Sequence, residues 1–160
     1  MEASRNGLMG KVKALLEKGA DIHEKDNIWS TAIIHASQNG HADIVNFLIQ
    51  NGANVNDINT QGWTALMYAS RDGFIEIVYT LLDNGAKDTI NQKNKGGSWT
   101  ALMYACCKRH IQIVKALLDK GASINVKNID NETALHIAQR YKFHSIVKLL
   151  ESSSRIKSTM

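Results

Sequence analysis

The sequence predicts an all-α protein, built as a solenoid in which short helix-turn-helix units are stacked side by side. Three observations lead to this prediction. Two short sequence markers recur in register along the chain, each unit between them contains two short apolar helices, and a glycine follows each second helix. Repetition with a period of 20–50 residues is typical of solenoids, in which one unit is one supersecondary element.

Two separate sequence markers recur along the chain at closely similar intervals. The glycine marker occurs as Lys18-Gly19-Ala20, Asn51-Gly52-Ala53, Asn84-Gly85-Ala86 and Lys120-Gly121-Ala122, with steps of 33, 33 and 36 residues. The threonine marker occurs as Thr31-Ala32, Thr64-Ala65-Leu66, Thr100-Ala101-Leu102 and Thr133-Ala134-Leu135, with steps of 33, 36 and 33 residues. The three extra residues therefore lie between Lys87 and Ser98, at Asp88-Thr89 and near Gly96-Gly97.

Each unit is expected to begin with a threonine that caps a short helix. The hydroxyl of Thr64 can accept a hydrogen bond from a backbone N–H that has no partner inside the helix. Gly73 then breaks the chain, as Gly40 does one unit earlier. A second helix follows, with Ile77, Val78, Leu81 and Leu82 at helical spacing. Gly85 comes next, where a left-handed cap is needed that costs other residues roughly 1–2 kcal/mol.

Neither helix of a unit is long enough to be stable alone, because isolated helices shorter than about 12 residues are marginal in water. Stacking supplies the missing burial, since each unit covers the apolar faces of its neighbours. The stability of such an array is close to a sum of unit terms and nearest-neighbour terms.

The pattern resembles the ankyrin repeat at nearly every defining position. The residues that carry the resemblance are Asn59-Thr60-Gln61-Gly62-Trp63-Thr64-Ala65-Leu66, Ala69, Gly73, Ile77-Val78, Leu81-Leu82 and Asn84-Gly85-Ala86. It covers about residues 3 to 151 and implies four to five repeats, with the first and last atypical. The implied fold is an ankyrin-repeat solenoid with protruding β-turn fingers.

The chain departs from the family pattern at two positions. Alanine replaces the usual proline, as Ala32, Ala65, Ala101 and Ala134, at a small expected cost because alanine is the best helix former. The usual histidine two residues later is present only as His136, where the other repeats have Ile34, Met67 and Met103. Fewer hydrogen bonds that brace the turns are therefore expected.

The repeats divide the chain into one ankyrin repeat domain, residues 1–151, and a polar and basic tail, residues 152–160. Within the domain the expected units are a partial first repeat at 1–25, then 26–58, 59–94 and 95–127, and a capping repeat at 128–151. The last helix is expected to end at Glu151, where other repeats have an apolar residue. Polar substitution on an outermost helix is what a terminal cap requires.

Composition places the chain among ordinary intracellular domains. No run of eighteen apolar residues is present, and charged residues interrupt the first twenty positions, so neither a membrane span nor a signal peptide is expected. Adjacent Cys106 and Cys107 are poorly placed to bridge each other, which favours a reducing cytoplasmic setting. The net charge of +4 is carried by residues 139–160, and a solvated face explains such a short basic run. A monomer is expected.

No catalytic motif is present, and the protein is expected to be neither an enzyme nor a cofactor-binding protein. The chain lacks a phosphate-binding glycine loop, a Gly-x-Ser-x-Gly elbow and a His-Glu-x-x-His helix. Cys106 and His110 are four residues apart, but the repeat register places a helix break between them, so no metal site is expected. His41 and His110 occupy a slot where the resemblance implies a structural histidine.

The resemblance implies that a partner protein binds the concave face, formed by the turn tips and the first helices. By register, the candidate turn residues are Ile28, Gln61, Trp63, Trp99, Asp130 and Glu132. The candidate helix residues are Gln38, Asn39, Arg71, Asp72, Lys108 and Tyr141. A standard interface would bury about 800 Å² on each partner.

The family resemblance also implies a candidate site of modification. Asparagines at the positions of Asn56, Asn91 and Asn125 are hydroxylated in this family in some hosts.

Trp63 and Trp99 share one slot in successive repeats, with Trp29 one position earlier in the preceding turn. One interpretation is an exposed aromatic ridge, because tryptophan often carries interface energy. The other is that each ring simply packs along the next turn. Likewise, the segment from Lys87 to Ser98 is either a projecting functional loop or a tolerated insertion.

A second functional hypothesis is that Trp63 and Trp99 hold an anionic small ligand or nucleic acid by stacking, assisted by Arg71 and Lys108. The dependence of binding affinity on salt concentration distinguishes the two hypotheses. Nucleic-acid affinity falls steeply as salt rises from about 50 to 200 mM, whereas an apolar protein interface changes little. Protein binding is favoured by the family resemblance, and nucleic acid is not the expected partner.

Overall fold

The computed structural model describes the backbone of residues 1–158 and the side chains up to residue 154. Within this range the secondary structure is helical and includes no β-strand, which confirms the predicted all-α solenoid. The helices are α1 (Glu2–Arg5), α2 (Met9–Glu17), α3 (Ala32–Gln38), α4 (Ala42–Gln50), α5 (Ala65–Asp72), α6 (Ile75–Asp83), the 3₁₀ helix η1 (Ala86–Thr89), α7 (Ala101–Cys107), α8 (Ile111–Asp119), α9 (Ala134–Arg140) and α10 (His144–Ser158).

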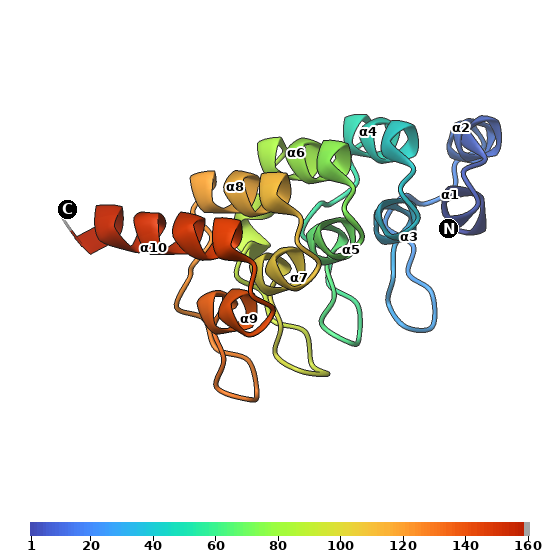
Figure 1. Cartoon of the computed structure of the whole chain (residues 1–160). Coiled ribbons are helices and arrows are strands. Elements are labelled where there is room, and N and C mark those ends of the chain that lie inside the picture. Colours follow the sequence, from blue (N-terminus) through green and yellow to red (C-terminus); the bar gives the residue numbers. More distant parts are fainter. Residues whose placement is uncertain (159–160) are drawn as a thin grey trace.

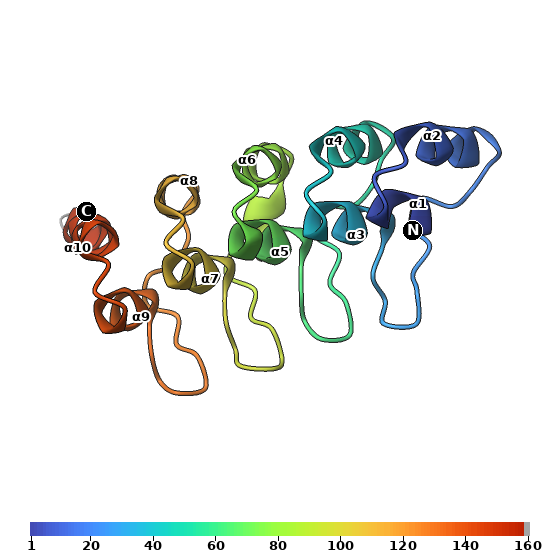
Figure 2. The same cartoon turned by 45° about the vertical axis from the view of Figure 1, so that its right-hand side comes forward.

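The helices form two layers that run the length of the array. The odd-numbered helices α1 to α9 form an inner layer, and the even-numbered helices α2 to α10 form an outer layer above it (Figure 1). Each inner helix packs against its own outer helix and against the inner helix of the next unit. The loops that lead into α3, α5, α7 and α9 all extend to the side away from the outer layer (Figure 2).

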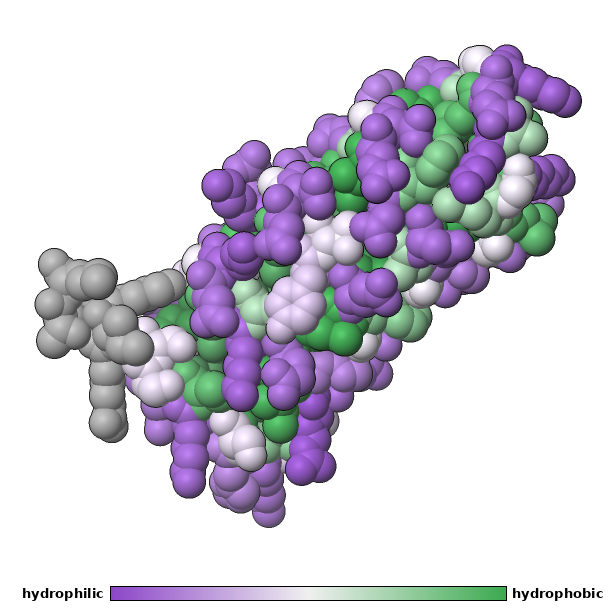
Figure 3. All heavy atoms as spheres, turned by 90° about the horizontal axis from the view of Figure 1, so that it is seen from above, coloured by the Kyte–Doolittle hydropathy of each residue, from purple (hydrophilic) through white to green (hydrophobic). Residues whose placement is uncertain are grey.

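The hydrophobic core lies between the layers and between neighbouring units. The side chains with the largest buried volumes come from both layers of the central units, among them Ile33, Ile44, Leu66, Leu81, Leu102 and Leu117. Seen from the outer side, the surface is mostly hydrophilic, with apolar atoms visible in strips (Figure 3). No helix among the described residues is long and apolar enough to cross a membrane.

Threonine caps start three of the inner helices as predicted. The hydroxyls of Thr64 and Thr100 accept hydrogen bonds from backbone N–H groups 3.2 and 3.3 Å away. Thr133 forms a reciprocal capping box with His136, the one unit that has the family histidine. The prediction is wrong at Thr31, whose buried hydroxyl makes no hydrogen bond. Its backbone has the extended cap conformation, but the side chain does not reach the helix.

The insertion between Lys87 and Ser98 divides into two parts that behave differently. The first part forms the 3₁₀ helix η1, which packs against α6 and buries Ala86 and Ile90. The hydroxyl of Thr89 also donates to the side-chain oxygen of Asn56 in the preceding unit, at 2.7 Å. Only the second part, around Gly96-Gly97, projects as a loop. The expectation that the whole segment projects is therefore wrong for its first half.

The last helix does not end at Glu151, because α10 continues to Ser158. Earlier outer helices stop at a glycine with left-handed backbone, but position 154 of this unit is a serine. The hydroxyls of Ser152 and Ser153 donate to the carbonyl of Leu149 inside the helix, so they do not interrupt it. The predicted tail is thus helical up to Ser158. Residues 159–160, and the side chains of the basic residues Arg155 and Lys157, lie outside the described part.

Gly73 is required at the break between α5 and α6 for two physical reasons. Its φ is 86°, in the left-handed region, and a Cβ atom there would lie 2.7 Å from the His110 ring. The ring lies there because its Nε2 donates to the carbonyl of Arg71, at 3.1 Å. His41 makes the equivalent contact two units earlier, with the carbonyl of Arg5 at 3.0 Å. These two histidines therefore tie neighbouring units together.

Replacing Gly73 with alanine is predicted to lower the free energy of unfolding by at least about 2 kcal/mol, from left-handed strain plus the clash with His110. Urea unfolding measures this loss. Gly10→Ala serves as the control, because Gly10 lies in α2 with open space around it and should gain about 0.5–1 kcal/mol. Equal effects of the two variants would contradict the assignment.

Candidate functional site

The four loops on the inner side are built alike, and we call them the first to fourth fingers (residues 26–30, 59–63, 94–99 and 128–132). Each finger is closed by a backbone hydrogen bond from its first residue to the carbonyl of its last, at 3.0–3.1 Å. The side chain of that first residue, Asp26, Asn59, Asn94 or Asn128, accepts further backbone N–H groups of the same turn. The turns are therefore fixed internally.

Backbone hydrogen bonds also join each finger to the next. The N–H of Thr60 donates to the carbonyl of Ile28 at 2.9 Å, and the N–H of Lys95 donates to the carbonyl of Gln61 at 2.8 Å. The N–H of Ile129 donates to the carbonyl of Gly97 at 3.1 Å. The fingers thus form one connected row, and side chains on their tips keep fixed relative positions.

The two central tryptophans lie in a ladder of aromatic rings. Trp63 stacks on Tyr68 of its own unit, with ring centroids 4.5 Å apart, and on Tyr104 of the next unit at 4.8 Å. Tyr104 in turn lies 5.2 Å from Trp99, so it separates the two tryptophans that the register places in one slot. Both tryptophans are half-buried against the core. The equal spacing from Trp63 to Tyr68 and from Trp99 to Tyr104 was the sequence signal for this ladder.

The positive charge of Arg71 is paired with a carboxylate of the same protein. Its guanidinium donates two hydrogen bonds to the carboxylate of Asp72, at 2.8 and 2.7 Å, and these bonds raise the pKa of Arg71. It also lies over the rings of Trp63 and Tyr68, 5.0 and 5.2 Å from their centroids. Lys108, which occupies the position of Asp72 one unit further on, is exposed and has no ion-pair partner among the described residues.

The remaining predicted site residues lie in the fingers or at the C-terminal ends of the inner helices α3 and α9, and they differ in exposure. Those that are exposed are Ile28, Asn39, Gln61, Asp130 and Tyr141, and those that are partly buried are Gln38 and Glu132. Glu132 accepts a hydrogen bond from Arg140 at 2.7 Å, which links the fourth finger to α9. Together with Trp63, Trp99, Arg71, Asp72 and Lys108, and with Trp29 and Ile129 described next, we call these residues the finger surface.

Two exposed apolar side chains mark the ends of the finger row. Trp29 is 59% exposed at the first fingertip, and its backbone has a left-handed φ of 61°, a conformation that Gly62, Ser98 and Asn131 share at the same place in the other fingers. A bulky residue in this conformation is uncommon and strained. The ammonium of Lys25 lies over the Trp29 ring, 5.6 Å from the ring centroid. Ile129, on the fourth finger, is 68% exposed. The sequence places Ile129 at a turn tip and Trp29 beside the tryptophan slot, but neither was selected as a partner-binding residue.

The first finger rests on a buried polar network. His35 occupies the slot of Tyr68 and Tyr104, and its Nε2 donates to the carboxylate of Asp26 at 2.8 Å. Arg5 Nη2 lies 3.3 Å from both ring nitrogens. Burial lowers the pKa of His35, Arg5 and the chain amino group lower it further, and Asp26 opposes them. Backbone and His35 hydrogen bonds hold the pKa of Asp26 below 3.8, although burial acts in the opposite direction.

The described residues contain no group of histidine, cysteine and acidic side chains suited to a metal ion. The predicted helix break between Cys106 and His110 is present, because α7 ends at Cys107 and α8 begins at Ile111. Both cysteines are free, and burial raises the pKa of the Cys106 thiol to about 12. Such a thiol stays protonated at neutral pH and is a poor nucleophile.

Two of the asparagines in the modification slot hold neighbouring units together. The side chain of Asn56 donates to the carbonyl of Gly85 at 3.1 Å, besides accepting from Thr89. The side-chain oxygen of Asn91 accepts from the N–H of Ser123 at 2.8 Å. Hydroxylation at these positions, or at the exposed Asn125, stays an expectation from family resemblance.

These features define a helical repeat protein whose paired helices present a row of fingers. A family model described as ankyrin repeats (3 copies) matches residues 1–94 and again residues 86–159. The chain therefore belongs to the ankyrin repeat family. No curated protein matches the sequence.

The buried His35 predicts how stability depends on pH. Since its folded pKa lies below 6.5, the unfolded chain binds the proton more tightly, and stability is lost as pH falls below about 6.5. The loss cannot exceed about 1.4 kcal/mol per pH unit for one proton. Urea unfolding between pH 5 and 7.5, where Asp26 stays ionised, measures it. His35→Gln keeps a donor to Asp26 and should flatten the slope; an unchanged slope would refute the assignment.

Proposed function

We propose that this chain is a non-enzymatic module that binds a partner protein on the finger surface. The observation that carries the proposal is the strained and exposed Trp29 on a row of fingers whose backbones are hydrogen-bonded to one another. Strained residues persist where the surrounding structure fixes them, and they cluster at functional sites. Tryptophan is also the residue type most enriched among those that dominate binding energy.

Family membership supports the same function, because ankyrin repeats generally mediate protein–protein interactions. We further propose that the five helix pairs of the described chain are five repeats, with the first and last atypical. The finger surface extends across all of these except the first, so a partner can contact several units at once. Because the fingers are already held in place before binding, less conformational entropy is lost when a partner binds.

The chemistry of the finger surface indicates what the partner offers. Its apolar contacts are Ile28 and Trp29 at one end and Ile129 at the other. Between them, Lys95 on the third finger and Lys108 at the end of α7 are exposed and make no ion pair with a described residue. A partner with apolar anchors spaced along its surface and acidic groups between them would match this arrangement.

Two contacts weigh against the alternative of an anionic ligand held between the tryptophans. Tyr104 already occupies the space between Trp63 and Trp99, because its ring stacks on that of Trp63 and lies tilted against that of Trp99. Arg71, the cation beside them, is neutralised by Asp72. A base inserted there would have to displace a packed ring and break a two-bond ion pair.

The test compares variants of the fingers with a variant of the outer layer. The chain is used as bait, a captured protein is identified and purified, and its dissociation constant is measured at 50 and 200 mM salt. Ile28→Ser combined with Trp29→Gly should weaken binding at least about tenfold, since exposed anchors of this kind often contribute more than 1.4 kcal/mol. Affinity should change little with salt, in contrast to nucleic-acid binding.

Tyr79→Ser provides the matched control, because Tyr79 is a similarly exposed aromatic residue (47%) on the outer helix α6. It should leave affinity unchanged. The proposal fails if the outer variant weakens binding as much as the finger variant, or if the finger variant binds normally. Alanine at Trp63 or Trp99 is a poorer test, because it also removes rings that pack between units.

The backbone strain at Trp29 predicts that Trp29→Gly alone has opposite effects on the stability of the fold and on its affinity for the partner. Glycine adopts φ near 60° freely, so the variant should gain up to about 1 kcal/mol in the free energy of unfolding. The same variant should bind the captured partner more weakly. Thermal or urea unfolding measures the first effect. A clear loss of stability would mean that the indole contributes to folding rather than to recognition.

A further inference from the structure

The short connections between inner and outer helices follow one another along one edge of the array (Figure 2). Two hollows open at this edge. The wider one, with a volume of about 410 Å³, is lined by Ile75, Arg109 and Ile111. The smaller one, of about 120 Å³, is lined by Arg109, Ile111, Lys142 and Phe143. We call these five residues the basic edge.

The repeat register shows that the charge of this edge changes along the array. The second and third units have a glycine at the helix break and an acidic residue three positions later, whereas the next two units have a basic residue and then a neutral one. These pairs are Gly40 and Asp43, Gly73 and Glu76, Arg109 and Gln112, and Lys142 and Ser145. The formal charge of the two positions together is therefore −1 in each earlier unit and +1 in each later one.

Both cations have a backbone conformation that glycine adopts more easily. The φ angle is 62° at Arg109 and 57° at Lys142, compared with 78° at Gly40 and 86° at Gly73. A side chain costs free energy in this left-handed region, and glycine avoids the cost. Strained residues of this kind cluster at functional sites. The strain agrees with the charge pattern in marking these two positions.

Neither cation is neutralised within the described part of the chain. The guanidinium of Arg109 lies over the ring of Phe143, 5.6 Å from the ring centroid, and makes no ion pair there. Lys142 is exposed and makes none either. The edge thus combines apolar hollows with unpaired positive charge, which is complementary to an acidic partner with apolar side chains.

The aromatic rings at this edge are already packed against protein groups. Phe143 stacks on Tyr141, with ring centroids 5.7 Å apart. The guanidiniums of Arg109 and Arg140 lie over Phe143 and Tyr141, respectively. Nucleic-acid bases are held by stacking on open aromatic faces. Ile75, Ile111 and Phe143 are also partly buried, unlike apolar residues that insert into a membrane. A protein segment is therefore the favoured occupant.

We propose that the basic edge binds an extended acidic segment of a partner protein, in which two apolar residues lie three positions apart between aspartates or glutamates. Neighbouring helices pack about 8–10 Å apart. A polyproline II chain advances about 9 Å in three residues and presents the same face again. The apolar side chains would enter the two hollows, and the carboxylates would pair with Arg109 and Lys142. This site adjoins the finger surface at Lys108 and Tyr141 but goes beyond it.

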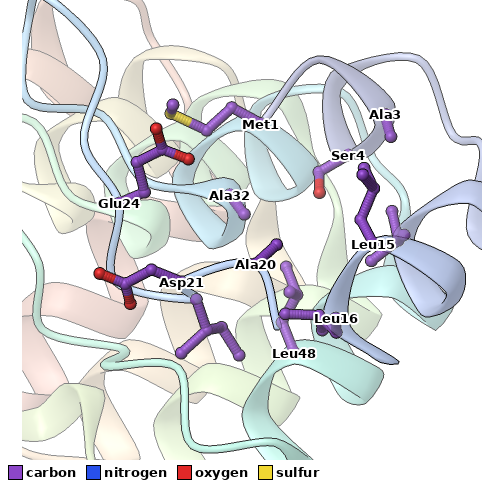
Figure 4. A pocket seen from close by; sticks show the side chains of 12 residues that line it. Met1, Ala3, Ser4, Leu15, Leu16, Ala20, Asp21, Glu24, Ala32 and Leu48 are labelled. Carbon is purple, nitrogen blue, oxygen red and sulfur yellow. The ribbon is translucent and has the colours of Figure 1, made fainter. Parts of the chain in front are cut away.

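The hollow of the first unit provides a contrast within the same chain. It has a volume of about 140 Å³, and Leu15 and Leu16 line one side of it, while Asp21 and Glu24 lie along the other (Figure 4). Its carboxylates should repel an acidic segment. Binding of the segment there would mean that apolar contact alone attracts it.

The probe is the blocked peptide Glu-Asp-Leu-Glu-Asp-Leu-Glu-Asp. It is titrated into the full-length, isotope-labelled chain while backbone amide NMR shifts are recorded. Shifts are expected at Arg109, Ile111 and Phe143, with saturation below about 1 mM peptide. A peptide with serine in place of both leucines should bind at least about tenfold more weakly, because the apolar anchors are gone. A peptide of the same composition with adjacent leucines should also bind more weakly.

Charge reversal gives the sharpest test. Arg109→Glu combined with Lys142→Glu should abolish binding of the acidic peptide and create binding of a peptide that has lysine at each acidic position. Lys115→Glu combined with Lys148→Glu is the matched control, because these exposed cations lie in the same two units but line neither hollow. The control should leave the affinity for the acidic peptide unchanged.

Lys142→Gly tests strain and binding together. It should raise the urea midpoint, because glycine relieves the left-handed strain, and it should weaken binding of the acidic peptide. A lower urea midpoint would mean that Lys142 stabilises the fold, which would contradict the inference.

Other results would also overturn it. These are shifts that are absent at millimolar peptide, that appear around Leu15, or that persist in the charge-reversed variant. So would a single-stranded oligonucleotide or phosphatidylserine vesicles that shift the same amides when the peptide does not. Ile28→Ser combined with Trp29→Gly should leave peptide binding unchanged, so failure here is distinguishable from failure of the finger surface.

Discussion

Burial of apolar surface between neighbouring units is the interaction on which the rest of this structure depends. The helices of the central units have seven to nine residues, too few to be stable alone in water. Leu66 and Leu81 are fully buried because a unit lies on each side of theirs. Leu15 is the counterexample, since it holds the same position as Leu81 in the first unit, which packs against a neighbouring unit on one side, and it is 41% exposed. Each unit is therefore stabilised by packing against its neighbours.

Stacking also determines the geometry of the surface that we assign to binding. Because the units are in register, the N–H of one finger meets the carbonyl of the previous one, and the tips become a continuous row. A strained tryptophan can persist at the first tip because this row and the Asp26–His35 pair hold the turn in place. The stability of the array and the shape of the finger row thus depend on the same repeated contact between units.

Much of this architecture could be predicted from the sequence, because the markers report local requirements. Gly73 and Gly85 are needed for left-handed backbone, and the threonines at 64, 100 and 133 cap helices, so their spacing fixed the units. What the sequence did not reveal depended on contacts across units. Tyr104 separates Trp63 from Trp99 through packing that no single unit specifies. The conformation of Trp29 was hidden because tryptophan does not ordinarily indicate a left-handed turn. Helix α10 continues to Ser158 because position 154 is a serine where earlier units have the glycine that ends the outer helix.

Residue-resolved amide hydrogen exchange of the whole chain tests the dependence on neighbours most directly. If stability is a sum of unit and interface terms, protection should be graded along the array. The slowest exchange is predicted in α5 and α7, which have complete units on both sides, and faster exchange in α1, α2 and α10. Equal protection of all helices, with one global opening, would contradict the account. So would the highest protection in the first unit.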